Sequence, residues 1–339
     1  MRLPKVRRAV VIFVDGLGAE NLRQAAGHAR FLNSFEANPI RCEFPSTTAT
    51  SISGFATGTR SAEHGVIGYS VFLRGEQRFQ NLLTGWESAE HATAFKKHPD
   101  LTETTPRGSV SVIGPEIYRD SGFTALTMSQ SEYLAADSIA DRFKVAKAQV
   151  SVGRGVSYLY IPELDQLAHR FGVESMQWRN ALEEVDGLVA EFATGLPKDV
   201  GVILTADHGV IDVSNENHVL LDAHEWFTQS VRIVTGDPRC NFIYLNEDVD
   251  AQAFQSKLLD LVGVSAVVCT HSQLANTGWV MVEAEHSLSY QPDFYLIWQD
   301  SFVSYDRRTA KPHHLKLIGQ HGAITDTEMR VPAIRFGAY

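Results

Sequence analysis

Aspartate and histidine residues follow several apolar runs in this sequence, at positions where metal ligands can gather. Asp15 follows the run AVVIFV, and Asp207 and His208 follow the run VGVILTA. Asp165 and His169 are four residues apart, so on a helical turn they share one face. The full set of candidate ligands is Asp15, Asp165, His169, Asp207, His208 and His321. Carboxylate oxygens and imidazole nitrogens without thiolates suit zinc or manganese, and harder divalent ions also accept them.

Each candidate has an ordinary structural explanation when it is taken alone. Asp15 can form a turn, His169 can be a hydrogen-bonded helix residue, and His321 can lie in a loop before a glycine. Six residues of the right type at the ends of predicted elements are poorly explained by six independent structural roles. The set therefore favours a metal site.

A run of hydroxyl residues in the segment EFPSTTATSISGFATG, residues 43–58, supplies a candidate nucleophile. One interpretation is a Ser/Thr cap on a short helix of small residues. The other places a hydroxyl at the positive end of that helix, where a phosphate binds well and a metal lowers the pKa of the hydroxyl for attack. Spacing alone does not choose among Ser46, Thr47, Thr48, Thr50 and Ser51.

The elements that must position these residues alternate between strand and helix. AVVIFVDGLG and VGVILTADHG each read as a buried strand that ends in a turn, and MQWRNALEEVDGLVAEFAT has apolar residues at helical spacing. This alternation predicts an α/β fold with a mainly parallel central sheet and helices on both faces. Ligand sites in such sheets form beyond the carboxyl ends of the strands, where the acids lie.

A second, smaller unit interrupts this pattern. NFIYLN, AQAFQSKLLDLV, AVVCT and FYLIWQD predict a small strand–helix–strand insertion that packs as an α+β cap. We expect the catalytic core to comprise residues 1–214 and 311–339, and the cap to comprise residues 215–310.

Composition limits the class of protein. The 339 residues carry a net charge of −10, which argues against a nucleic-acid surface because binding to that polymer needs a basic face. The thiols of Cys42, Cys240 and Cys269 are too few and scattered for a disulfide framework and are expected to be buried. The apolar run at the N-terminus is too short for a membrane span or a signal peptide, so we expect a cytoplasmic protein without a membrane partner. The oligomeric state stays open.

Five motifs, in order, resemble the type I phosphodiesterase/nucleotide pyrophosphatase branch of the alkaline phosphatase superfamily. They are VDGLG, FPSTTATSISGFATG, ELDQLAHRFG, TADHG and GQHGAIT, and they run from Asp15 to His321. The resemblance implies an alkaline-phosphatase-like core and hydrolysis of phosphodiester or pyrophosphate bonds in small, nucleotide-like substrates. The alternative activity at the same site is phosphomonoester or phosphonate hydrolysis. The alternative without enzymatic activity is a metal-stabilised binding protein.

The resemblance also assigns roles to individual residues. It makes Thr48 the nucleophile, which would form a phospho-threonine intermediate. It implies two divalent metal ions. Zinc is the expected metal, and manganese is the alternative. One ion would be held by Asp165, His169 and His321, and the other by Asp15, Asp207 and His208, with Thr48 bridging to it.

The sequence departs from the family pattern near the phosphate site. Tyr69 stands where the family usually has an asparagine, and Ser51 replaces another asparagine, so the phosphate pocket must differ. No Lys or Arg occurs in residues 43–58, which favours a diester whose second substituent rests against Phe55 or Tyr69. Of the other histidines, His64 is expected to be structural, and four more are expected to be solvated rather than ligating: His218, His224, His313 and His314. Among these, His314 is the candidate for an approach to the site from the cap.

Overall fold

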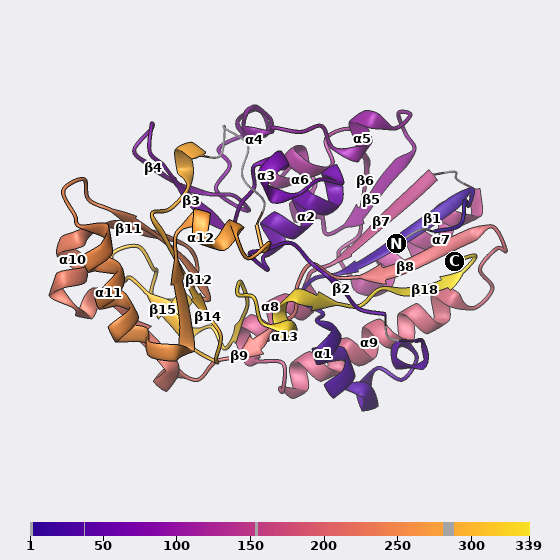
Figure 1. The fold of residues 1–339 in the computed structure, drawn as a ribbon. Helices are drawn as coiled ribbons and strands as arrows, with labels where there is room; N and C mark the ends of the chain where they lie inside the picture. Colours follow the sequence, from indigo (N-terminus) through magenta and orange to yellow (C-terminus); the bar gives the residue numbers. More distant parts are fainter. Residues whose placement is uncertain (1–2, 37, 153–154, 281–287) are drawn as a thin grey trace.

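A six-stranded sheet forms the centre of the computed structural model, which describes residues 3–36, 38–152, 155–280 and 288–339 (Figure 1). Its strands, in spatial order, are β18 (Ile334–Gly337), β8 (Val200–Thr205), β1 (Arg8–Val14), β7 (Gly155–Ile161), β5 (Val110–Gly114) and β6 (Glu132–Ala135). All neighbouring strands are parallel except β18, which pairs antiparallel with β8. The predicted mainly parallel sheet is confirmed.

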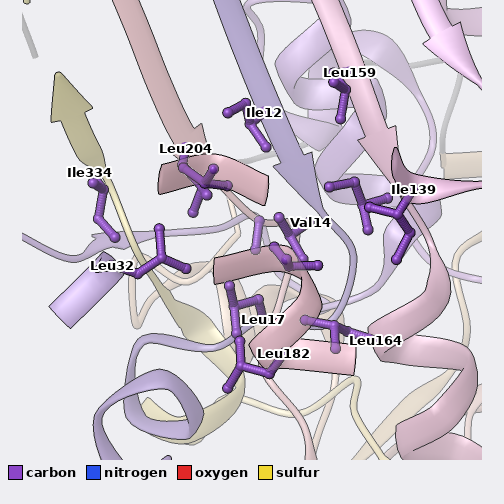
Figure 2. Packing of buried hydrophobic residues seen from close by; sticks show 14 of the residues in the cluster. Ile12, Val14, Leu17, Leu32, Ile139, Leu159, Leu164, Leu182, Leu204 and Ile334 are labelled. Carbon is purple, nitrogen blue, oxygen red and sulfur yellow. The ribbon is translucent and has the colours of Figure 1, made fainter. Parts of the chain in front are cut away.

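Helices cover both faces of this sheet because side chains alternate along each strand. Val10, Ile12 and Val14 of β1 enter one apolar cluster, part of which is shown in Figure 2. That cluster also contains residues of α1 (Ala19–Gln24), α7 (Ile139–Val152), α8 (Glu163–Phe171) and α9 (Met176–Ala193). Val11 and Phe13 point the other way, into a cluster with α2 (Thr48–Thr57), and α6 (Gly122–Thr127) packs against α2 on that side.

A second sheet of four antiparallel strands lies beside the core (Figure 1). In spatial order its strands are β11 (Val231–Asp237), β12 (Cys240–Leu245), β14 (Phe294–Trp298) and β13 (Ala266–Cys269). One face packs on α10 (Glu225–Ser230) and α11 (Ala251–Val262), and the other packs on β3 (Ser70–Leu73), which forms a hairpin with β4 (Arg78–Asn81). The small α+β unit is thus present within residues 215–310, whereas its boundaries stay a prediction.

The remaining elements are short. They are β2 (Ile40–Arg41), α3 (Ser61–His64), α4 (Ala89–Phe95), α5 (Leu101–Thr104), β9 (Ile211–Asp212), β10 (His218–Leu220), α12 (His271–Ala275), β15 (Val303–Tyr305), β16 (Gly319–Gln320), α13 (Asp326–Met329) and β17 (Arg330–Val331). In the part of the chain that the structure describes, no helix has the length and apolarity that a bilayer span requires.

Candidate active site

The carboxyl ends of β1, β7 and β8 bring three aspartates together. The strands are adjacent and parallel, with Val14 opposite Ile161 and Phe13 opposite Thr205. Asp15 directly follows β1, Asp207 follows β8, and Asp165 lies in the first turn of α8 beyond β7.

Gly16 permits the close approach of α8 to this edge. Its φ is +72°, and a Cβ atom there would lie 2.9 Å from the Cβ of Asp165. A side chain at position 16 would therefore displace one of the candidate ligands.

Each of these aspartates has one carboxylate oxygen with no hydrogen-bond partner. These atoms are Oδ1 of Asp15, Oδ1 of Asp165 and Oδ2 of Asp207. The other oxygen of Asp207 accepts hydrogen bonds from the backbone amides of Gly16 and His208, each at 3.1 Å. Burial, and then the charges of Asp207 and Asp165, raise the pKa of Asp15 well above its usual value. Three carboxylates at one point, of which those of Asp15 and Asp207 are buried and that of Asp165 is half-buried, need a cation to be ionised together.

The three histidines offer the same ring nitrogen to these oxygens. Nδ1 of His169 lies 2.7 Å from the carbonyl oxygen of Gly319, Nδ1 of His208 lies 3.2 Å from that of Gly209, and Nδ1 of His321 lies 2.9 Å from that of Ser46. A carbonyl only accepts, so Nδ1 carries the proton in each ring and Nε2 presents a lone pair.

The imidazoles form one continuous group. The rings of His208 and His321 stack with centroids 3.7 Å apart, and His169 is 5.2 Å from His321. Burial lowers the pKa of His321 well below its usual value, and His208 and His169 lower it further. His321 is therefore neutral at physiological pH, as a metal ligand must be.

Among the residues that the structure describes, two groups of side chains have ligand atoms close enough to share a metal ion. Asp165, His169 and His321 form the first, which is the set that the family resemblance implied. The second contains Asp15, His208 and Asp165, so that Asp165 belongs to both groups. Oδ2 of Asp207 lies 3.7 Å from Nε2 of His208 and borders the second group.

Thr48 begins α2 and faces this cluster. Its Oγ1 lies 3.2 Å from Nε2 of His208, and its side chain is buried. Thr47 is the N-cap residue, but its hydroxyl makes no capping hydrogen bond. The hydroxyl of Ser46 donates to the carbonyl of Ala323, so it has a structural partner. Among the candidate hydroxyls, Thr48 is the one whose hydrogen bond to a candidate ligand the structure records.

Tyr160 is a site residue that our sequence analysis did not identify. Its hydroxyl donates a short hydrogen bond to Oδ2 of Asp15. Tyr158 lies two residues earlier in β7, on the same face, and its buried hydroxyl has no partner. The alternation in SYLYI placed both tyrosines on one face of β7, but it gave no indication that this face borders Asp15.

Two cavities meet at Thr48 and Asp165. The first, which we call the aromatic cavity, has a volume of about 540 Å³, and its lining includes Trp86, Tyr118, Phe123, Tyr133, Tyr158 and Tyr160. The second, which we call the polar cavity, has a volume of about 400 Å³, and its lining includes Tyr69, Asp237, Asp306, His313, His314 and Gln320.

The structure places the two proposed pocket residues differently. Tyr69 lines the polar cavity. Burial raises the pKa of its hydroxyl, and hydrogen bonds with Asn81 and Thr84 partly offset this rise. Phe55 is not part of the described lining of either cavity and packs against Phe13 and Tyr158, with ring centroids 5.6 Å away in each case. Phe55 lies two turns beyond the start of α2, and we no longer include it in the substrate site.

His64, His218 and His224 lie outside the two groups of candidate metal ligands. His64 is buried, its Nδ1 accepts from the backbone amide of Val66 at 3.1 Å, and burial lowers its pKa to about 3. His218 and His224 are half-buried beside Tyr305 and Trp226 rather than fully solvated.

His313 and His314 lie closer to the site than their polar sequence context suggested. Both line the polar cavity, where His313 is exposed and His314 is half-buried.

A buried ion pair joins the second sheet to the loops that carry the ligands. Arg239, in the turn after β11, bonds to Glu328 of α13 at 2.8 Å, and both side chains are fully buried. Glu328 accepts from the backbone amide of Ala323, two residues after His321. The carbonyl of Glu328 accepts from Gly209, which follows His208. This pair therefore ties two ligand-bearing loops to one anchor.

The three thiols are free in the structure. Cys240 and Cys269 are buried, as expected, whereas Cys42 is half-buried.

A sequence profile described as type I phosphodiesterase/nucleotide pyrophosphatase matches residues 9–322. No curated protein sequence matches the chain significantly.

Solved structures with low sequence identity share the fold. Murine ectonucleotide pyrophosphatase/phosphodiesterase 5, as an inactive threonine-to-alanine variant in complex with AMP, matches with a TM-score of 0.75 and 16% identity, covering 98% of this chain and 88% of that one. The human protein of the same name matches with a TM-score of 0.72 and 15% identity over 98% and 88% of the two chains. These likenesses confirm the predicted α/β architecture.

Proposed function

We propose that this chain, a phosphoric ester hydrolase that belongs to the type I phosphodiesterase/nucleotide pyrophosphatase family, cleaves nucleotide-like substrates with two divalent metal ions and Thr48 as nucleophile. The family membership confirms the resemblance that the sequence motifs indicated. Metal dependence, the identity of the metal and the role of Thr48 are the parts that we propose.

One observation carries the metal assignment. Three carboxylates each leave one buried oxygen unpartnered, and three imidazoles present Nε2 to them because backbone carbonyls hold every Nδ1 proton. This donor set fits divalent ions, with zinc favoured by the imidazoles and manganese next. The residues that would hold the ions are Asp15, Asp165, His169, Asp207, His208 and His321. Bound ions would lower the pKa of the nucleophile and stabilise negative charge on the phosphoryl oxygens.

Thr48 would form the covalent intermediate. Its oxygen bonds to phosphorus while the bond from phosphorus to the leaving oxygen breaks; the threonine proton passes to solvent and the leaving group takes a proton from water. Water then attacks phosphorus in the phospho-threonine and restores the hydroxyl. Because Thr48 is the first residue of the ten-residue helix α2, the free amides of its first turn point toward the phosphoryl oxygens.

The aromatic cavity supports a nucleoside as one substituent of the phosphate. Its rings surround a space that reaches both Thr48 and Asp165. Nucleobases gain about 1–3 kcal/mol from stacking on an aromatic side chain. The AMP complex of the murine relative is in line with this substrate class.

The test uses thymidine 5′-(p-nitrophenyl) phosphate, whose hydrolysis releases a coloured product. We expect turnover in the presence of zinc or manganese, its loss after chelation, and its return when metal is added back. The Thr48→Ala variant, loaded with metal in the same way, serves as the matched control and should be inactive. Turnover by a chain that contains no metal would refute the metal assignment.

A further inference from the structure

The two cavities at Thr48 correspond to the two substituents of a phosphodiester. Both cavities include Thr48 and Asp165 in their lining, so a phosphorus atom at Thr48 would border both of them. If the aromatic cavity takes the nucleoside, as in the proposed function, the polar cavity receives the group that leaves. The chemistry of the polar cavity then defines the leaving group.

Apart from the candidate metal ligands Asp165, His169 and His321 at its Thr48 end, the polar cavity offers little that would bind a phosphate on the leaving group. Among the described residues that line it, none is Lys or Arg. Asp306 is ion-paired with Arg308, at 2.7 Å, so that guanidinium is engaged. Lys311 and Lys316 lie in the same segment as His314 but are exposed and outside the lining. Proteins bind phosphate through Arg and Lys side chains above all, and beyond the candidate metal ligands the ionisable nitrogen donors of this described lining are the imidazoles of His313 and His314.

Asp237 supplies the polar cavity with a buried carboxyl group, one oxygen of which has no partner. It is the last residue of β11, it is 6% exposed, and its Oδ2 has no hydrogen-bond partner. Burial raises its pKa to about 8. The negative charge of Glu328 adds to this rise, and a hydrogen bond from the backbone amide of Tyr69 reduces it. The carboxyl can accept a hydrogen bond from a hydroxyl group in either protonation state.

The position of Asp237 is fixed by the residues around it. A Cβ atom on Gly322, the neighbour of His321, would lie 2.8 Å from the Cβ of Asp237. On the adjacent side, Ser70 and Gly236 exchange two hydrogen bonds, at 3.0 and 3.1 Å. The carboxyl is thus held in the wall of the cavity, one residue from a candidate metal ligand. A buried polar group without a partner is costly, and a ligand that satisfies it gains that energy.

We propose that the polar cavity binds an uncharged, hydroxyl-bearing leaving group, such as a glycerol-like alcohol, through a hydrogen bond to Asp237. This inference rests on the proposed function and deepens it, because it names the second half of the substrate. The enzyme would then prefer nucleoside phosphate esters of polyols over nucleotides with a pyrophosphate leaving group. Asp237 acts here as a specificity-determining residue.

Two esters that differ only in the leaving alcohol test this proposal. Adenosine 5′-(2,3-dihydroxypropyl) phosphate and adenosine 5′-propyl phosphate share the nucleoside, the charge and the reacting phosphorus. We expect kcat/KM of the metal-loaded enzyme to be at least about tenfold higher for the dihydroxypropyl ester. In Asp237→Leu the ratio should fall below about threefold, and this residual ratio measures the intrinsic reactivity of the two alcohols. Asp237→Asn keeps a donor and an acceptor and should retain most of the preference.

An exposed acid provides the matched control. Asp248→Asn changes a carboxylate of the same type outside the cavity, and it should leave the ratio at the wild-type value. A wild-type ratio below about threefold overturns the proposal even if Asp237→Leu does not fold. An equal ratio in wild type and Asp237→Leu overturns it as well.

An ammonium leaving group is the competing outcome. If the 2-aminoethyl ester is preferred over the dihydroxypropyl ester and Asp237→Asn abolishes that preference, the cavity selects a cation and the proposal is overturned. Failure of the proposed function gives a different pattern. In that case thymidine 5′-(p-nitrophenyl) phosphate is not hydrolysed either, and the leaving-group assignment fails with it.

Discussion

The hydroxyl oxygen of Thr48 lies 3.2 Å from Nε2 of His208, although 160 residues separate them in the sequence. Thr48 starts α2 on one face of the central sheet, and His208 follows the carboxyl end of β8. The contact places the candidate nucleophile directly against the candidate metal ligands. It also distinguishes Thr48 from Thr47, whose hydroxyl is buried without a partner.

Replacement of Thr48 by alanine should reduce kcat for a nucleotide diester by more than about a thousandfold, because the reacting oxygen is removed. Thr47→Ala should cost less than about tenfold. Metal content and the circular dichroism spectrum should be unchanged in both variants. An inactive Thr47→Ala together with an active Thr48→Ala would show that the nucleophile is the preceding residue.

Diesters should be better substrates than monoesters. A monoester carries close to two charges, and recognition of its free oxygens gains from nearby cationic groups. Arg60, the first Lys or Arg after residues 43–58, is paired with Glu43 at 2.6 Å and is not available for this role. We expect kcat/KM for bis-p-nitrophenyl phosphate to exceed that for p-nitrophenyl phosphate under one metal condition. A tenfold preference for the monoester, about 1.4 kcal/mol in transition-state binding, would favour a phosphatase instead.

Removal of the Tyr160 hydroxyl should weaken metal binding. The hydroxyl donates to Oδ2 of Asp15, and such bonds orient a ligating carboxylate. In Tyr160→Phe we expect the affinity for one of the two ions to fall by about 10- to 100-fold, measured by competition with a chelator. Tyr133→Phe, whose hydroxyl bonds to the carbonyl of Pro115, is the control. Equal metal affinity in wild type and Tyr160→Phe would contradict the assigned role.

Asp237 should make stability depend on pH. Burial raises its folded-state pKa to about 8, whereas the pKa of an aspartate in an unfolded chain is about 3.9. Between these values the folded chain binds the proton that the unfolded chain has lost, so the free energy of unfolding falls as pH rises. The urea midpoint of wild type should therefore decrease relative to that of Asp237→Asn from about pH 5 to pH 8. Parallel curves for the two proteins would refute the raised pKa.

The strand ends were predictable from sequence, and the surroundings of the site were not. Asp15 and Asp207 each follow an apolar run, and parallel strands bring such positions to one edge of the sheet. The family motifs added Thr48 and His321. Asp237 gave no such signal, because its burial depends on the packing of β11 against Tyr69 and Gly322, which are far from it in sequence.

Side-chain direction was the other property that the sequence did not reveal. Phe55 and Tyr69 are both aromatic residues near the nucleophile, yet the helical turns of α2 direct Phe55 into the core. Tyr160 was hidden within a strand whose alternation identifies a face but not what that face contacts.

Metal content and activity, measured on the same preparation, test the central claim most directly. The donor set of three aspartates and three histidines should bind close to two divalent ions per chain. We expect elemental analysis of the purified protein to give this stoichiometry after zinc or manganese loading. Hydrolysis of a nucleotide diester should disappear as the ions are removed and return as they are replaced. Full activity in a sample that elemental analysis shows to be free of metal would contradict the account.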